Sequence, residues 1–249
     1  MVTHPSTQPL PAELLARLLA ADAARPRLTW YDDDPGPTAG ERIELSGRVL
    51  ANWVSKAANL LQDDAAAEPG TTVGIDLPAH WRSVYWALAT WSVGATVVLG
   101  ESATGADVLV TDSPERASAH RGDAVLVTLA ALARSHPLAA EAAGAVDEAR
   151  ELSTHGDVFS PMAEPERADV ALATEAGDTA YGNLVVLQPS WGAAPRVALR
   201  GTTEQVLRGC LSAWAADGSV VIGRGVSARD AERLASESVT VDARDETRG

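Results

Sequence analysis

The sequence has little cysteine, little lysine and no cluster of metal-binding side chains. Cys210 is its single cysteine, which excludes an internal disulfide and leaves no set of thiolates for a metal. The five histidines follow no metal-ligand spacing. We therefore expect no metal site and no cofactor, and a protein of the reducing cytoplasm.

Long apolar runs and an excess of positive charge are also missing. No stretch approaches the roughly 20 apolar residues that cross a bilayer, and the first ten residues do not resemble a secretion signal. The formal net charge is −14, so a nucleic acid would meet net repulsion. We expect neither a membrane nor a nucleic acid as a partner.

What the sequence does contain is an alternation of strand and helix patterns. The hydrophobic spacing predicts helices at residues 11–24, 45–61, 80–93, 129–134, 202–216 and 227–237, with a further helical piece of undefined extent in 137–150. It predicts strands at residues 28–31, 73–77, 95–99, 107–111, 124–128, 170–173, 184–187, 197–199, 220–222 and 239–241. This order indicates an α/β fold of mostly parallel sheets with helices on both faces.

One unit of the sequence occurs twice. A helix ending in Ala-Thr-Trp91, a stop at Gly94 and an apolar strand are matched by a helix ending in Ser-Ala-Trp214, a stop at Gly218 and a second apolar strand. A polar, proline-containing segment at 161–169 reads as a connection. We expect two similar α/β halves, with subdomains at residues 1–160 and 161–249.

The sequence also predicts the role or the burial of several single side chains. Ser46 is expected to cap the second helix, whose buried face includes Val49, and Lys56 is expected to face water. The three aspartates in 32–34 belong to a turn-rich segment, which favours a solvated loop over a metal site. Cys210 falls on the apolar face of a helix and is expected to be a small buried hydrophobe.

A glycine-rich turn offers one nucleotide-site candidate. Gly223 and Gly225 begin a G-x-G-x-x-A pattern between a strand and a helix, Ser227 is expected to cap that helix in a capping box with residue 230, and Asp242 follows at the next strand. In dinucleotide-binding proteins such glycines let a pyrophosphate approach a helix N-terminus while the carboxylate holds a ribose. Glycines required only by the geometry of the turn are the competing interpretation.

From residue 25 onward the order of elements resembles the adenylate-forming superfamily of acyl-CoA synthetases, peptide-synthetase adenylation domains and luciferases. Residues 26–30, 44–61, 69–78 and 86–99 are similar to that superfamily's opening strand, first helix, "pGd.Vai.lp" segment and "lA.l.aGav.vpl" segment. A weaker similarity continues through 182–184, 211–222 and 238–240. The resemblance implies the fold of the N-terminal part of those enzymes.

The resemblance also implies a phosphate-binding loop, and the sequence departs from it there. The corresponding stretch leaves vestigial candidates at Thr174, Gly177, Thr179 and Gly182. It carries Glu175 and Asp178 where the superfamily has neutral donors, and no lysine follows. Acidic groups repel a triphosphate, and Lys56 lies in an early helix, where it cannot replace the superfamily's C-terminal catalytic lysine.

These observations predict a degenerate, truncated homologue that lacks ligase activity and has no catalytic residues. We expect a binding or assembly protein of unknown ligand that forms a homo-oligomer or binds a partner protein, because the surfaces that the full-length enzymes cover would otherwise be exposed. Two alternatives remain open. The chain could be half of a split acyl-AMP ligase completed by a partner chain, or a nucleotide-binding protein that uses the turn at Gly223.

Overall fold

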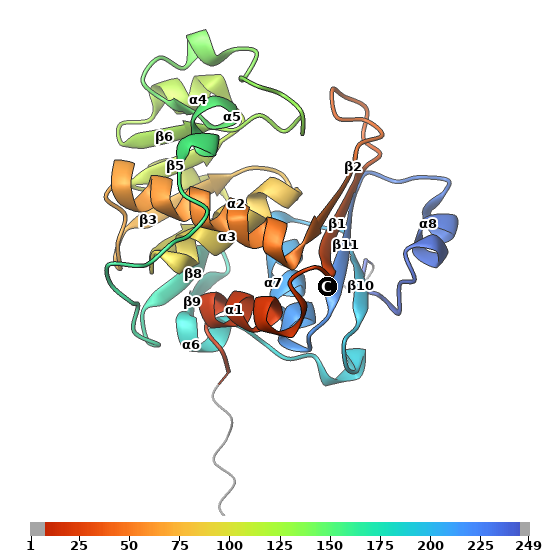
Figure 1. Cartoon of the computed structure of the whole chain (residues 1–249). Helices are drawn as coiled ribbons and strands as arrows, with labels where there is room; N and C mark the ends of the chain where they lie inside the picture. The colour runs from red at the N-terminus through yellow and green to blue at the C-terminus, as the bar shows by residue number, and fades with distance from the viewer. Residues whose placement is uncertain (1–7, 245–249) are drawn as a thin grey trace, which may run out of the picture.

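The computed structural model describes residues 8–244 (Figure 1). The helices are α1 (Pro11–Asp22), α2 (Gly47–Asn59), α3 (Trp81–Ser92), α4 (Pro114–Ala119), α5 (Glu148–Glu151), α6 (Tyr181–Leu184), α7 (Thr203–Ala215) and α8 (Asp230–Ser236). The strands are β1 (Pro26–Asp32), β2 (Arg42–Ser46), β3 (Thr72–Asp76), β4 (Thr96–Val98), β5 (Val108–Thr111), β6 (Asp123–Leu126), β7 (Val146–Asp147), β8 (Val170–Thr174), β9 (Gly177–Ala180), β10 (Arg196–Leu199), β11 (Ser219–Arg224) and β12 (Val241–Asp242). Within the described range, no helix has the length and apolar character that a bilayer crossing requires.

The strands form two mostly parallel sheets. The five-stranded sheet has the order β12-β10-β11-β1-β2, and the seven-stranded sheet has the order β7-β6-β5-β3-β4-β8-β9. Among the strands of residues 8–244, only β2 and β9, each at a sheet edge, pair antiparallel to their neighbours. The predicted α/β fold with mostly parallel sheets is thereby confirmed. Within the larger sheet, β4-β3-β5-β6-β7 follows the doubly wound order 2-1-3-4-5, in which the chain reverses direction between β3 and β5.

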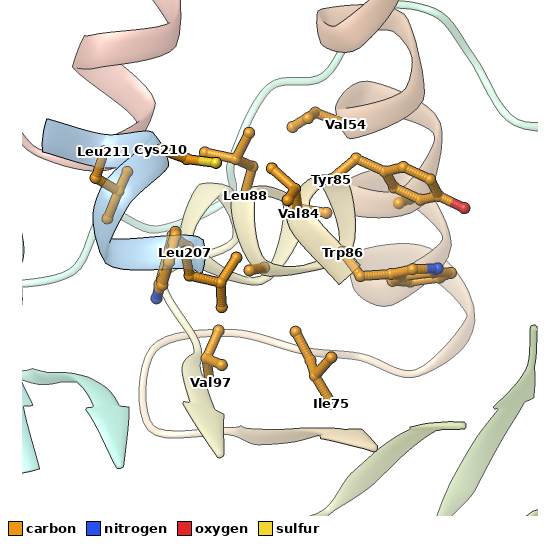
Figure 2. Packing of buried hydrophobic residues seen from close by; sticks show 14 of the residues in the cluster. Val54, Ile75, Val84, Tyr85, Trp86, Leu88, Val97, Leu207, Cys210 and Leu211 are labelled. Atoms are coloured by element: carbon orange, nitrogen blue, oxygen red, sulfur yellow. The ribbon is translucent and has the colours of Figure 1, made fainter. Parts of the chain in front are cut away.

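A layer of helices lies between the two sheets (Figure 1). Helix α3 contacts β3 and β4 on one side and β1 on the other, while α2 contacts β1 and β2 and α7 contacts β10 and β11. Figure 2 shows side chains of α2, α3 and α7 meeting above Ile75 and Val97 of the larger sheet. They belong to one continuous hydrophobic cluster that includes strands of both sheets.

The division of the chain predicted at residue 160 does not coincide with the sheets. Strands β1 and β2, from the first segment, lie in the five-stranded sheet with β10, β11 and β12. Strands β8 and β9, from the second segment, complete the seven-stranded sheet. Each sheet therefore combines both parts of the chain, and the shared helical layer joins them.

The repeated sequence unit corresponds to a repeated structure. Helix α3 leads into β4, which pairs in parallel with β8, and the indole N–H of Trp91 donates to the Ala171 carbonyl oxygen of β8 at 2.8 Å. Helix α7 leads into β11, which pairs in parallel with β1, and the indole of Trp214 donates to the Arg27 carbonyl oxygen of β1 at 3.1 Å. Both tryptophans thus bind the strand beside the one that follows their own helix.

The second helix differs in part from its prediction. The Ser46 hydroxyl accepts the Val49 N–H at 3.3 Å, as a cap does, but the Val49 side chain is 41% exposed. The buried face is rotated by one position, onto Leu50 and Val54. Lys56, predicted to face water, instead binds the carbonyl oxygens of Ser153 and His155 at 3.3 and 2.5 Å.

The helix predicted at residues 129–134 is absent, because other groups bind its backbone. The Ala131 N–H donates to Glu41 Oε1 at 3.3 Å, and the Ala130 carbonyl oxygen accepts from Arg82 Nη2 at 3.4 Å. Leu132, which a helix would need to bury, is 94% exposed. The segment is an open loop, and it forms one wall of a hollow described below.

Two further segments differ from the sequence prediction. Residues 184–187 were predicted as a strand, but Leu184 ends α6 and residues 185–187 form a loop, because β9 already occupies the edge beside β8. The polar segment after β5 contains α4, which was not predicted. Its start has a recognisable signal, since the Ser113 hydroxyl accepts the Arg116 N–H at 3.2 Å and Pro114 occupies the first turn.

Candidate functional site

A hollow of about 930 Å³ lies at the carboxyl ends of the parallel strands in the larger sheet. Its walls are residues 75–78, 99–101, 174–176 and 202–204, together with Thr104, Asp112 and Arg116. We call this the acidic hollow. It opens beside the ends of β3 and β5, where the strand order reverses, and open α/β sheets bind their ligands at that point.

Close packing under a short turn shapes one wall. Gly74 of β3 lies beneath the 3₁₀ turn Glu101–Gly105, and a Cβ at this position would come within 2.0 Å of the Ala103 carbonyl oxygen. Only glycine permits this approach. The turn therefore rests directly on the strand and carries Glu101 to the rim of the hollow.

Carboxylates outnumber cations around the acidic hollow. Its lining contains five acidic side chains and one basic side chain: Asp76, Glu101, Asp112, Glu175, Glu204 and Arg116. Arg116 is already paired with Asp76, and the Thr111 hydroxyl donates to the same carboxylate at 2.6 Å. The lining thus has a surplus of negative charge.

The pKa of Asp112, in the wall of the acidic hollow, is raised by its surroundings. Desolvation by burial is the largest influence and raises its pKa, and the nearby Asp76 charge acts in the same direction. Arg224 and His136 oppose this rise. The environment of Asp112 therefore shifts this carboxyl towards its neutral form.

Three of the predicted phosphate-loop residues fall on one hairpin, formed by β8 and β9. Thr174 and Gly177 are register partners, and the Thr174 hydroxyl donates to the Gly177 carbonyl oxygen at 3.1 Å. Between them Glu175 reaches the 3₁₀ turn that follows β4, where its Oε1 lies 3.5 Å from the Glu101 amide nitrogen. The tip of the hairpin thus presents a carboxylate to the acidic hollow.

Of the four phosphate-loop candidates, Thr179 and Gly182 lie away from the tip of the hairpin. The Thr179 hydroxyl accepts from Arg208 Nη2 at 3.1 Å, and Arg208 Nε donates to Glu204 at 2.8 Å, so one arginine connects β9 with α7. Gly182 lies in α6, where its N–H donates to the Arg167 carbonyl oxygen at 2.9 Å. The structure brings Thr174, Gly177 and Thr179 together on the hairpin and places Gly182 outside it.

The glycine turn after β11 packs against Asp33 and Asp34 at Gly225 and against Arg200 at Gly223. Gly223 is still part of the strand, and Gly225 has a φ of +74°. A Cβ at Gly225 would come within 2.5 Å of Asp34 Oδ1. Ser227 accepts the Arg229 N–H at 3.2 Å, but α8 begins only at Asp230 and has no side-chain cap, so the predicted capping box is wrong.

Asp242 does not adjoin the glycine turn in the sheet. It lies on β12, and β10 separates β12 from β11. Its carboxylate binds Arg244 at 2.7 Å, which lowers its pKa. The turn and Asp242 are therefore not on neighbouring strands, and a carboxylate stands where a pyrophosphate would approach the glycines. Nucleotide binding here stays a prediction.

The three consecutive aspartates are ion-paired, and the prediction of a solvated loop is wrong for Asp32. That side chain is buried, accepts the Asp34 N–H at 3.0 Å and lies 3.8 Å from Arg224. Asp33 binds Arg233, whose hydrogen bond lowers the pKa of the aspartate. No cluster of three or more His, Cys, Asp or Glu able to hold a metal occurs in residues 8–244.

Cys210 is buried in the interhelical cluster, as predicted (Figure 2). Burial raises the pKa of its thiol, which therefore stays protonated at neutral pH. A protonated thiol in an apolar contact is a poor nucleophile, and the side chain has a packing role.

Sequence reasoning missed the side chains that define the acidic hollow on the sheet side, namely Asp76, Asp112 and Arg116. A signal was available, because Asp76 ends β3 and Asp112 directly follows β5. Carboxyl ends of parallel strands converge at one edge, so polar residues there are candidates for a site. Their charge surplus could not be read without the strand order.

Comparison by sequence finds a relative of nearly the same length. No model of a known protein family matches the chain. A Mycobacterium tuberculosis protein named "TIGR03089 family protein" is 31% identical over 255 residues, covering 96% of this chain and 99% of that protein.

Comparison with solved structures shows which proteins share the architecture of this chain. Acetoacetyl-CoA synthetase from Streptomyces lividans superposes with a TM-score of 0.72 at 17% identity, over 94% of this chain and 42% of that one. An acyl-CoA synthetase from Brucella canis superposes with a TM-score of 0.70 at 15% identity, over 97% of this chain and 48% of that one. The N-terminal subdomain of NpsA from Klebsiella oxytoca superposes with a TM-score of 0.67 at 16% identity, over 96% of this chain and 62% of that one. The chain thus spans about half the length of these solved proteins.

The structural likeness covers almost the whole described chain and, in each solved protein, only a part. It extends over both sheets and the helices between them, which agrees with the resemblance first seen at residues 26–99. At 12–17% identity it establishes the fold alone. The chain belongs to the TIGR03089 family and has the fold of the N-terminal part of the adenylate-forming enzymes.

Proposed function

We propose that this chain is a non-catalytic binding protein, in which the acidic hollow holds a small ligand that carries no phosphate. The observation that supports this most directly is the carboxylate surplus at the switch point of the larger sheet. Enzymes that transfer an adenylyl group must stabilise a triphosphate, for which backbone amides, cations and a metal are the usual means. Here the hairpin tip instead carries Glu175.

Charge repulsion makes triphosphate binding costly. Two like unit charges 4 Å apart repel by about 1 kcal/mol in bulk water and by about 4 kcal/mol at the effective dielectric of a protein surface. Glu175 is exposed, so its repulsion of a phosphate lies towards the lower value. The only guanidinium in the lining, Arg116, is held by Asp76. Arg208 stands behind the hairpin but is shared between Glu204 and Thr179.

The same surplus favours a ligand with an ammonium or guanidinium group. Glu101 and Glu175 are neighbours at the rim, where the Glu101 amide nitrogen lies 3.5 Å from Glu175 Oε1. A cation placed between them would relieve their mutual repulsion. A volume of about 930 Å³ is within the range of small-molecule sites.

The absence of adenylation is tested by pyrophosphate–ATP exchange with the protein and a panel of aliphatic and aromatic carboxylic acids. We expect exchange at the level of a protein-free control. Exchange above that level with the chain alone would overturn the proposal. Exchange that appears only after a second polypeptide with a catalytic lysine is added would favour the split acyl-AMP ligase instead.

The ligand preference is tested by NMR titration with butylamine, using butanol as the uncharged analogue. We expect butylamine to shift resonances of the hollow and to bind about five-fold or more weakly to Glu175→Gln, because one carboxylate is lost. Glu232→Gln is the matched control, since Glu232 is an exposed carboxylate on α8, outside the hollow. Equal effects of the two variants would contradict the proposed site.

Self-association and a cytoplasmic location stay predictions. Several large apolar side chains are exposed and available for a contact: Leu132, Val158, Met162 and Val226. They lie in separate segments of the chain, and the binding role proposed here does not depend on an oligomer.

A further inference from the structure

A second hollow, of about 550 Å³, lies between two loops that sequence reasoning did not place together. Its walls come from the β1–β2 loop, within residues 32–38, and from the open loop within 127–137, with Asp112 and Arg224 completing it. We call it the loop hollow. It adjoins the acidic hollow through Asp112, which lines both. It is otherwise formed by the ends of β1, β6 and β11.

The walls of the loop hollow are fixed by contacts from beneath. The Ala131 N–H donates to Glu41 Oε1 at 3.3 Å, which ties the two loops together. Below them Arg82 forms a buried ion pair with Glu148 at 3.0 Å, and its other nitrogen binds the Ala130 carbonyl oxygen at 3.4 Å. These contacts form the loop hollow in the folded chain, so a ligand need not order it.

The charged groups beside the loop hollow already have partners. Arg224 lies between Asp34, at 3.0 Å, and the buried Asp32, at 3.8 Å. The Asp32 carboxylate also accepts the Thr38 hydroxyl and the Asp34 N–H. His136 Nδ1 accepts the Leu138 N–H at 3.2 Å, so this nitrogen is occupied. Burial raises the pKa of Asp112, which favours its neutral form.

The remaining lining is apolar, with one hydroxyl left unpaired. Val127, Leu129, Ala130, Ala133 and three prolines contribute carbon surface. Thr128 is 6% exposed, and its Oγ1 has no hydrogen-bond partner within the described part of the chain. A buried hydroxyl without a partner is costly, and a ligand group that reaches it would remove that cost.

We propose that the loop hollow is a binding site for a small, uncharged and mostly apolar molecule with one hydroxyl or amide group, such as an aromatic amide. A charged molecule would have to enter without a free counter-ion, since Arg224 already pairs with two aspartates and the Asp32 carboxylate already accepts from Thr38. An uncharged ring matches the carbon surface, and its polar group can pair with Thr128. This site is separate from the acidic hollow and does not depend on the function proposed for it.

The test uses benzamide, with benzoate and benzylamine as its anionic and cationic analogues, titrated into the isotope-labelled protein by NMR. We expect benzamide to shift backbone resonances in residues 127–137 and at Arg224, with a Kd of about 1 mM or tighter. We expect both charged analogues to bind at least five-fold more weakly. Shifts centred on the acidic hollow, equal binding of a charged analogue, or no shifts with benzamide would overturn the proposal.

Two variants check the location. Ala133→Trp fills the hollow and is expected to abolish benzamide binding, while Ala21→Trp, on the exposed face of α1, is the control that leaves it unchanged. Thr128→Val keeps the shape of the side chain and removes the hydroxyl. It is expected to raise the Kd for benzamide about five-fold. An unchanged Kd in both Ala133→Trp and Thr128→Val would place the ligand elsewhere.

Discussion

At the scale of single residues, the buried pair of Arg82 and Glu148 is the most unusual feature. Both side chains are almost fully buried, and the Arg82 Nη1 atom lies 3.0 and 3.1 Å from the two carboxylate oxygens. Desolvation is the dominant influence and raises the pKa of Glu148 to about 7, although Arg82 acts against it. The desolvation penalty on the ionised Glu148 carboxylate is therefore larger than the stabilisation that Arg82 gives it.

This shift predicts a pH-dependent contribution to the free energy of unfolding. Between pH 4.5 and about 7 the folded chain holds a proton on Glu148 that the unfolded chain releases. Its contribution to stability is therefore complete at low pH and is lost as the pH rises to about 7. Relative to Glu148→Gln, the wild-type chain should lose on the order of 1 kcal/mol per pH unit in this window, measured by urea unfolding.

A comparison with Glu148→Gln is needed because His80 acts in the opposite direction. Burial and the nearby Arg82 lower the pKa of His80, so acidification below its usual pKa of 6.5 destabilises the fold. The variant retains His80, and the difference between the two curves isolates Glu148. Curves that stay parallel from pH 5 to 8 would contradict the raised pKa.

At the scale of elements, the paired tryptophans give a second prediction. Trp91→Phe and Trp214→Phe each leave a buried carbonyl oxygen without its donor, which costs about 1–3 kcal/mol beyond the loss of ring surface. Trp86→Phe is the control, because its buried indole N–H has no hydrogen-bond partner in residues 8–244. Urea unfolding should show a larger loss for the first two variants than for the third, and equal losses in all three would contradict the paired role.

Elements with a strong hydrophobic period were predictable, and those fixed by distant partners were not. Helices α3 and α7 and strands β3 and β11 agree closely with the pattern, because their apolar faces are buried where the period requires. Residues 129–134 have a helical pattern but form a loop. Their backbone groups bind Glu41 and Arg82, which lie 90 and 48 residues away in the sequence.

At the scale of the whole molecule, the sequence was sufficient for the fold class and insufficient for the site. The resemblance in residues 26–99 led to the correct architecture, since strand and helix order determine it. The division at residue 160 was not recovered in the sheets, because β1 and β8 each join strands from the other part of the chain. The acidic hollow depends on that exchange, as it combines ends of β3, β4 and β8 with the start of α7.

The most direct test of the proposed function is binding of MgATP to the whole chain, measured by isothermal titration calorimetry at low and at physiological salt. The carboxylates of the acidic hollow predict no binding heat at nucleotide concentrations up to about 1 mM, in the wild-type chain and in the control Glu232→Gln. A saturable heat with a Kd below about 100 μM, competed by AMP, would contradict the account.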